Sequence, residues 1–175
     1  DILELLARAY LINGQHRDSA ELFKRLSLSR AESFEIWYGL GAALSRLEEF
    51  AEAVAAFENA VELNALHAES WSGLGRALHA CGRIEEARST LDTALKVSPE
   101  CSETWYNLGL IESDQGRLAE AVGCFEKAAK ANPQFAPIWN NLGTVLLRSG
   151  KLKESRRAYE TALELKPDYN TPRHG

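Results

Sequence analysis

Residues 71–99, WSGLGRALHACGRIEEARSTLDTALKVSP, contain the pattern that decides the fold. Nearly the same pattern returns at residues 105–133 as WYNLGLIESDQGRLAEAVGCFEKAAKANP. The tryptophans of the chain follow one another at a constant spacing of 34 residues: Trp37, Trp71, Trp105 and Trp139. Self-similarity at a fixed period of this length indicates a repeat architecture, in which each unit is one supersecondary element stacked on the next.

Other columns keep the same period around each tryptophan. A leucine and then a glycine follow it: Leu40, Leu74, Leu108 and Leu142, with Gly41, Gly75, Gly109 and Gly143. A small residue and a large apolar residue come later: Ala53, Ala87, Ala121 and Ser155, with Phe57, Leu91, Phe125 and Tyr159. Proline closes three units: Pro99, Pro133 and Pro167. Agreement over so many columns excludes a chance spacing of tryptophans.

Each unit reads as two amphipathic helices joined by a short turn. From Trp37 the apolar residues recur at helical spacing through Leu40 and Leu44, and a second helical face runs from Phe50 to Leu63. Glycines mark the turns between the two faces in the other units: Gly14, Gly82, Gly116 and Gly150. The pattern predicts ten helices, over 2–13, 17–29, 35–47, 51–63, 69–81, 85–97, 103–115, 119–131, 137–149 and 153–165.

The pattern W-x2-L-G…A-x3-F…P at this period resembles the tetratricopeptide repeat (TPR) family. The resemblance implies an all-α fold, a right-handed superhelical solenoid of about five helix-turn-helix repeats in one domain over 1–175. The expected repeats are 1–33, 34–67, 68–101, 102–135 and 136–169, followed by a tail at 170–175. The first repeat is degenerate, with Leu3 in the tryptophan column.

Composition excludes several classes of function. The 175 residues carry 20 Lys and Arg against 25 Asp and Glu, a net charge of −5, so a nucleic-acid partner is not expected. No run of 18 apolar residues occurs, so no membrane span is expected. The chain begins at Asp1 and contains no Met, which indicates a fragment or a processed chain. Its three scattered cysteines suggest a reducing compartment, and we expect a cytoplasmic location.

The sequence contains no recognisable catalytic or metal-binding motif. Cys81, Cys101 and Cys124 form no CxxC pair, and the four histidines have no ligand partner at metal-binding spacing. The glycines match neither a phosphate loop nor a dinucleotide fingerprint. The sequence therefore predicts a protein that is not an enzyme and that needs no cofactor and no metal.

The resemblance implies that first helices line a concave groove that binds a peptide. The groove residues expected on these helices are Tyr38, Arg76, Tyr106, Asn107, Asn140, Asn141, Thr144 and Arg148. Asn107 and Asn141 share one column and resemble the asparagine ladder of peptide-binding members such as the repeat domain of O-GlcNAc transferases. Gly39 and Gly73 occupy the earlier rungs, either as room for a bulky ligand group or through drift.

The charge of the groove edge predicts the kind of partner. One column holds an acidic residue in each of the first four repeats: Asp1, Glu35, Glu69 and Glu103. This edge favours a neutral or basic peptide over an acidic one, and the Lys and Asn pair of the carboxylate clamp that reads Hsp70 and Hsp90 tails is missing. Two alternatives stay open. The chain can be the substrate-recruiting region of a larger enzyme, such as a glycosyl- or sulfotransferase, or a scaffold that self-associates.

Charged residues also stand in two columns that are otherwise apolar. Arg88 and Arg156 replace the valine of Val54 and Val122, and Glu112 replaces a leucine. A lone buried charge is costly, so Arg88 and Glu112 are expected to form an ion pair between the third and fourth repeats. Arg156 is expected to make the last helix a polar cap of the solenoid.

Overall fold

The computed structural model describes residues 2–166, and every regular element in this range is an α-helix. The helices are α1 Ile2–Ile12, α2 His16–Ser29, α3 Phe34–Arg46, α4 Phe50–Leu63, α5 Ala68–Ala80, α6 Ile84–Val97, α7 Ser102–Asp114, α8 Leu118–Ala131, α9 Ala136–Arg148 and α10 Leu152–Leu165. Each bound lies within one residue of its predicted position. The predicted all-α repeat solenoid is confirmed; residues 167–169 of the fifth expected repeat and the tail at 170–175 lie outside the described residues.

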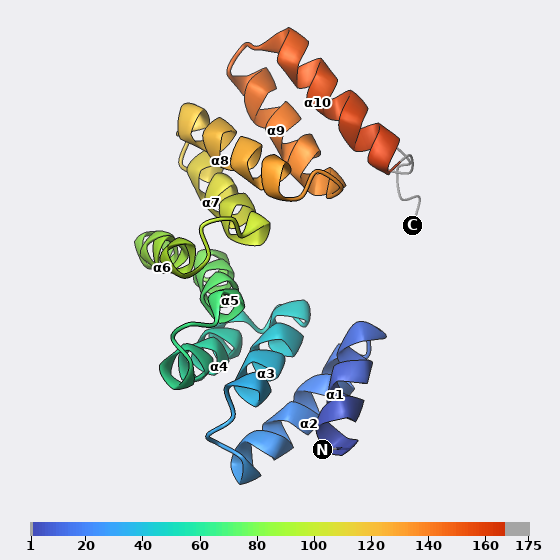
Figure 1. The fold of residues 1–175 in the computed structure, drawn as a ribbon, viewed down its shortest axis with the longest axis vertical. Helices are drawn as coiled ribbons and strands as arrows, with labels where there is room; N and C mark the ends of the chain where they lie inside the picture. The colour runs from blue at the N-terminus through green and yellow to red at the C-terminus, as the bar shows by residue number, and fades with distance from the viewer. Residues whose placement is uncertain (1, 167–175) are drawn as a thin grey trace. The chain divides into compact units, whose positions relative to one another are not determined.

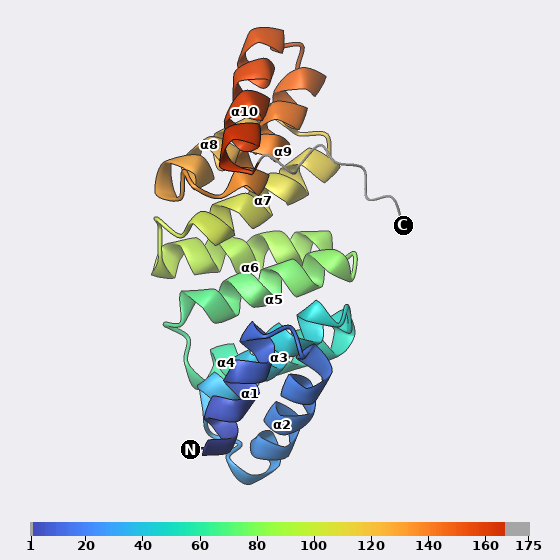
Figure 2. The ribbon, with the colours of Figure 1, turned by 90° about the vertical axis from the view of Figure 1, so that its right-hand side faces the viewer.

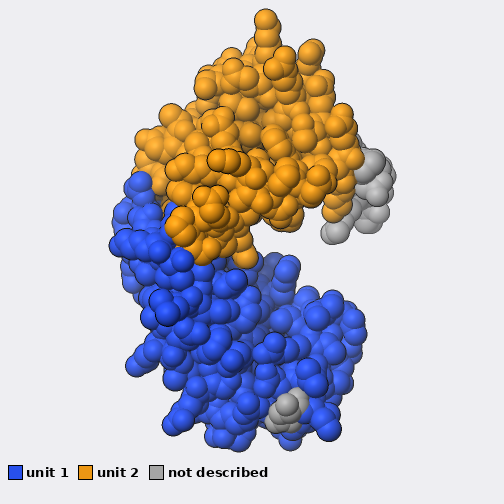
Figure 3. Space-filling model, viewed as in Figure 1, with its two compact units in different colours: residues 1–97 blue, residues 98–175 orange. Residues whose placement is uncertain are grey.

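The chain divides into two compact units, residues 1–97 and residues 98–175 (Figure 3). The first unit holds α1–α6 and the second holds α7–α10 (Figure 1 and Figure 2). Within each unit every helix packs on its sequence neighbours, and the first helices of successive repeats also touch, α1 on α3, α3 on α5 and α7 on α9. One continuous domain over 1–175 stays a prediction.

The turn inside each hairpin needs a left-handed backbone. Gly14, Gly82, Gly116 and Gly150 have φ between 73° and 80°, and Glu48 takes φ 61° in the second repeat. The next amide then donates to a carbonyl five residues earlier, as Glu49 does to Leu44 at 3.0 Å, which satisfies the end of the helix. Glycine adopts this conformation without the steric penalty that Glu48 carries.

The tryptophan column ties each hairpin to the loop that precedes it. Every indole Nε1 donates to the carbonyl six residues earlier, at 2.7 to 2.8 Å: Trp37 to Ala31, Trp71 to Ala65, Trp105 to Pro99 and Trp139 to Pro133. The rings are half-buried. The repeated tryptophan therefore fixes where each first helix begins, in addition to packing against the hairpin.

The terminal helices differ from the inner ones. Ile2 on α1 is 81% exposed, whereas Ile36 and Ile138 in the same column are fully buried. On α10 the guanidinium of Arg156 is exposed and lies 3.4 Å from the carboxylate of Glu160, in line with a polar outer face on the last described helix.

Candidate functional site

A pocket of about 190 Å³ opens on the first-helix side of the first unit. Its lining comes from α1, α2, α3 and the residue before α5: Arg8, Leu11, Phe23, Phe34, Glu35, Tyr38, Gly39 and His67. The His67 ring centroid lies 5.0 Å from the centroids of both Phe34 and Tyr38, edge-on to Tyr38. The pocket thus combines aromatic walls with one carboxylate.

His67 is held in place by the helix that it caps. Its Nδ1 accepts the backbone N–H of Ser70 at 3.2 Å and lies 2.7 Å from the Ser70 hydroxyl. An Nδ1 that accepts this N–H carries no proton, so the proton of the neutral ring is on Nε2, 3.4 Å from the carboxylate of Glu69. Capping therefore fixes the orientation of an aromatic ring that lines the pocket.

Glu35 gives the pocket a stable negative charge. The Ser33 hydroxyl donates to its carboxylate at 2.7 Å. This hydrogen bond, followed by the Glu35 backbone N–H and the charges of Arg8 and Arg30, holds the pKa of Glu35 below its ordinary value. Arg8 and Arg30 both bind the carboxylate of Glu4, at 2.7 and 3.1 Å. The Arg8 charge is therefore shared with Glu4, while Glu35 stays ionised at neutral pH.

The second unit builds a similar aromatic group on α7. The Tyr106 ring lies 5.9 Å from Phe125 and 5.7 Å from Phe135, edge-on to the latter. Tyr38 has the same relation to Phe57 and His67 in the first unit. Asn141 donates its amide to the Tyr106 hydroxyl at 2.9 Å, which joins two of the predicted groove residues.

The side chains of two more predicted residues on α9, Thr144 and Arg148, are already engaged in hydrogen bonds, and Asn140 takes part through its backbone carbonyl. Thr144 donates to the backbone carbonyl of Asn140 at 3.0 Å, so its hydroxyl accepts from Tyr159 at 2.9 Å. Arg148 donates to the carbonyl and hydroxyl of Ser113, at 3.2 and 3.0 Å. These bonds link α9 to α7 and α10 and hold the α9 side chains in defined orientations.

The glycines at the earlier rungs of the asparagine column have a packing role. A Cβ on Gly39 would lie 2.3 Å from Phe23, and one on Gly73 would lie 2.6 Å from Phe57. Both phenylalanines are essentially fully buried. Neither of the two explanations offered by the sequence, room for a ligand or drift, accounts for these glycines, because rings of the protein itself occupy the space.

Asn107 is less accessible than the sequence predicts for a groove residue. Its side chain is 4% exposed, and its Nδ2 is buried without a hydrogen-bond partner in the described part of the chain. An unpaired buried donor destabilises the fold on its own. Asn107 is therefore the predicted groove residue with an unmet bonding capacity.

We expect Asn107→Leu to raise the free energy of unfolding by about 1 kcal/mol or more, because it removes the unpaired amide and has higher helix propensity. Chemical denaturation followed by circular dichroism measures the change. Asn141→Leu is the matched control, since its amide is bonded to Tyr106; that variant is expected to lose stability. A lower stability of Asn107→Leu would show that the amide is satisfied in solution.

The structure does not gather all predicted residues into one pocket. Tyr38 lines the pocket, whereas Arg76 on α5 is half-buried outside it. The sequence missed Phe34, His67 and Phe135, which precede or open the first helices. For His67 and Phe135 the signal is the column of residues just before each first helix, Ser33, His67, Cys101 and Phe135, whose chemistry changes from repeat to repeat; Phe34 stands one residue later, at the start of α3.

Two kinds of feature are absent from residues 2–166. No group of three or more His, Cys, Asp or Glu side chains is placed to hold a metal ion. None of the helices in this range is both long enough and apolar enough to cross a membrane.

One family model of the tetratricopeptide repeat matches residues 4–49 and 106–170, and a second model of the same repeat matches residues 44–108. No curated protein sequence matches the chain. Solved structures with a similar fold include MamA 41-end from Desulfovibrio magneticus RS-1, with 19% identity, TM-score 0.77, and coverage of 97% of this chain and 96% of that one.

Two other similar structures are TPR proteins. One is TTC0263 from Thermus thermophilus, with 21% identity, TM-score 0.83, and coverage of 95% of this chain and 91% of that chain. The other is YrrB, described as having an unusual peptide-binding site, with 18% identity, TM-score 0.68, and coverage of 95% and 86%. The chain belongs to the tetratricopeptide repeat family, whose members generally act as protein–protein interaction modules and not as enzymes.

Proposed function

We propose that the first-helix faces of this chain bind a neutral or basic peptide segment of a partner protein and that the chain catalyses no reaction. The observation that carries the proposal is the pocket of the first unit, where aromatic rings surround the ionised Glu35. Rings attract a cation through their faces, and a carboxylate beside them adds a charge-assisted hydrogen bond. A lysine or arginine side chain of the peptide fits this chemistry.

An acidic side chain is disfavoured at the same place. It would meet the Glu35 carboxylate, and the nearby guanidinium of Arg8 is already bound to Glu4. Like charges brought together at an interface cost affinity and thereby give specificity. The pocket thus supports the choice of a neutral or basic partner over an acidic one.

The second unit would read the backbone of a peptide. The amide oxygen of Asn141 is an acceptor next to the Tyr106 hydroxyl, whereas the amide nitrogen of Asn107 is buried and does not reach a bound peptide. These groups suit the N–H and C=O groups of an extended segment. In a larger enzyme, the same surface would recruit the substrate; a scaffold that self-associates is the other alternative. The free cysteines support a reducing location such as the cytoplasm.

A positional-scanning peptide array tests the proposal. We expect the chain to select lysine or arginine at one position, and Glu35→Gln to weaken binding of the selected peptide about tenfold, the size of one charge-assisted contact. Tyr38→Ala should weaken it as well. Glu32→Gln removes an exposed carboxylate in the loop before α3 and serves as the control. Selection of acidic residues, or equal binding by Glu35→Gln, would contradict the proposal.

A further inference from the structure

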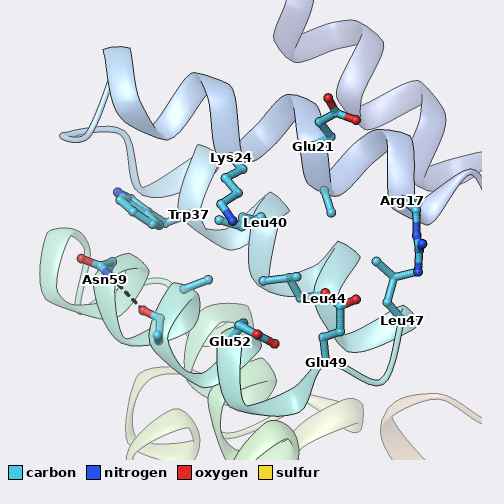
Figure 4. Close-up of a pocket in the computed structure, with 13 residues that line it drawn as sticks. Arg17, Glu21, Lys24, Trp37, Leu40, Leu44, Leu47, Glu49, Glu52 and Asn59 are labelled. Carbon is cyan, nitrogen blue, oxygen red and sulfur yellow. Dashed lines mark hydrogen bonds between the residues drawn. The ribbon is translucent and has the colours of Figure 1, made fainter.

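A second concavity lies on a different face of α3, between α2 and α4 (Figure 4). This α2–α4 cleft encloses about 370 Å³. Its floor is a stripe of α3, formed by Trp37, Leu40, Leu44 and Leu47, and small side chains of the flanking helices, Ala20, Ala55 and Ala56, complete its apolar walls. The side chains that line the first-helix pocket do not take part in it.

Two local substitutions leave this cleft open. Ala20 on α2 stands in the column that holds Val54 and Val122 in other repeats, so the wall is thinner here. In the second unit the Lys127 ammonium lies 3.9 Å from the Trp105 ring centroid. The residue in the corresponding position beside Trp37 is Asn59, whose amide turns back to the Ala55 carbonyl at 2.8 Å. No cation of the described chain therefore covers the Trp37 ring in this way.

The rim of the α2–α4 cleft carries charges of both signs. The α2 side presents Arg17, Glu21 and Lys24, and the α4 side presents Glu49 and Glu52; Figure 4 shows them around the apolar floor. All five side chains are exposed, and none forms an ion pair or a side-chain hydrogen bond within residues 2–166. Elsewhere on the surface such charges pair locally, as Arg83 does with Glu86 at 2.6 Å. The rim charges are available to a partner.

The polarity of the floor decides the conformation of that partner. The floor offers no free hydrogen-bonding group, because its single polar atom, Trp37 Nε1, already donates to Ala31 at 2.7 Å. An extended peptide laid on this floor would bury backbone groups without partners, whereas a helix satisfies its own. The stripe runs ten residue steps, from Trp37 on α3 to Leu47 at its C-cap, or about 15 Å, which matches roughly three turns of a docked helix.

We propose that the α2–α4 cleft binds a short amphipathic helix of a partner protein. Aliphatic side chains of this helix cover the Leu40 and Leu44 floor, in the way that an amphipathic helix fills an apolar groove. Basic side chains on one flank face Glu49 and Glu52, and acidic side chains on the other flank face Arg17 and Lys24. This surface is separate from the first-helix pocket, so the inference does not depend on the proposed peptide site.

The test uses a designed helical peptide of 14 residues with a fluorescent label as the probe. Its leucines recur at i, i+3, i+7 and i+10, with lysines on one flank and glutamates on the other. A twin peptide carries glutamates on both flanks. Fluorescence anisotropy with the full chain measures both affinities, and we expect the mixed-charge peptide to bind about tenfold more tightly than its acidic twin, because only its lysines can pair with the α4 carboxylates.

A pair of variants on α4 locates the binding. Ala55→Arg places a long side chain in the cleft, whereas Ala51→Arg places the same side chain one turn earlier, outside it. Both positions are exposed, and repeat five carries Arg157 and Lys153 in these two columns, so neither change should disturb the fold. We expect Ala55→Arg to weaken peptide binding at least about tenfold and Ala51→Arg to leave it unchanged. Binding to the peptide array should be the same for both variants.

Three results would overturn the proposal. They are the absence of saturable binding by the mixed-charge peptide, equal affinity of the two peptides, and equal affinity of the wild-type chain and Ala55→Arg. Sedimentation of the chain alone distinguishes another occupant. A self-association that is lost in Ala55→Arg and kept in Ala51→Arg would show that a second copy of the chain fills the cleft in place of a partner helix.

Discussion

Arg117→Leu is expected to lower the free energy of unfolding by about 3 kcal/mol, because it removes the guanidinium that donates to the buried Glu112 carboxylate. Glu112 is only 3% exposed, on a helix face that is otherwise apolar. Arg117, at the N-cap of α8, donates from Nε to this carboxylate. Chemical denaturation at neutral pH, followed by circular dichroism, measures the loss.

The double variant Arg117→Leu with Glu112→Leu is the control. Leu44, Leu78 and Leu146 occupy the Glu112 column in other repeats, so a leucine fits this site. Replacing both partners of a buried ion pair by apolar residues is often neutral or stabilising. We therefore expect the double variant to recover most of the stability. A double variant as unstable as Arg117→Leu would mean that the arginine acts through other contacts.

The helices could be predicted from the sequence because their signals are local. Apolar spacing sets each helical face, and a left-handed glycine such as Gly82 ends the first helix of a repeat. The indole hydrogen bond of Trp71 holds the start of the third repeat against the loop before it. The 34-residue period then brings the same signals back in each repeat. Glu48 shows the strength of this frame, since it adopts φ 61° where the other repeats have glycine.

The partner of Glu112 could not be predicted from the columns alone. The column identifies a charge in an apolar position, and the expected partner was Arg88 of the preceding repeat. The structure shows Arg117, which the turn after α7 brings back to Glu112 within one hairpin. A pairing with Arg88 would join the two units and stays a prediction. The periodic pattern describes what the repeats share, whereas this contact belongs to one repeat.

The pocket of the first unit was missed for a related reason. His67 stands before α5 in a column whose members differ chemically from repeat to repeat. The periodic pattern therefore does not identify it as a site residue. Its ring lines the pocket because His67 caps α5, and the Ser70 N–H that its Nδ1 accepts orients the ring toward Tyr38. Asn107 shows the opposite failure. The column of Asn107 predicted a groove residue. The burial of Asn107 depends instead on the packing around one helix, which leaves this residue only 4% exposed.

Gly39→Ala is expected to lower the free energy of unfolding by about 2 kcal/mol, although the same change in an ordinary helix gains up to about 1 kcal/mol. The new Cβ would lie 2.3 Å from Cζ of Phe23, far inside van der Waals contact. Phe23 is fully buried, so moving its ring aside disturbs its packing against core neighbours. Overpacking therefore outweighs the gain in helix propensity, and thermal unfolding should show a lower midpoint.

Gly123→Ala is the matched control for this effect. Gly123 also lies within a helix, α8, but nothing lies within 4 Å of the position its Cβ would take. That variant should gain about 0.5–1 kcal/mol, so the two substitutions have opposite signs. Phe23→Leu combined with Gly39→Ala tests the cause, because a smaller side chain frees the space. The two changes should be less destabilising together than the sum of their separate effects. Strict additivity would show that the ring is not the obstacle.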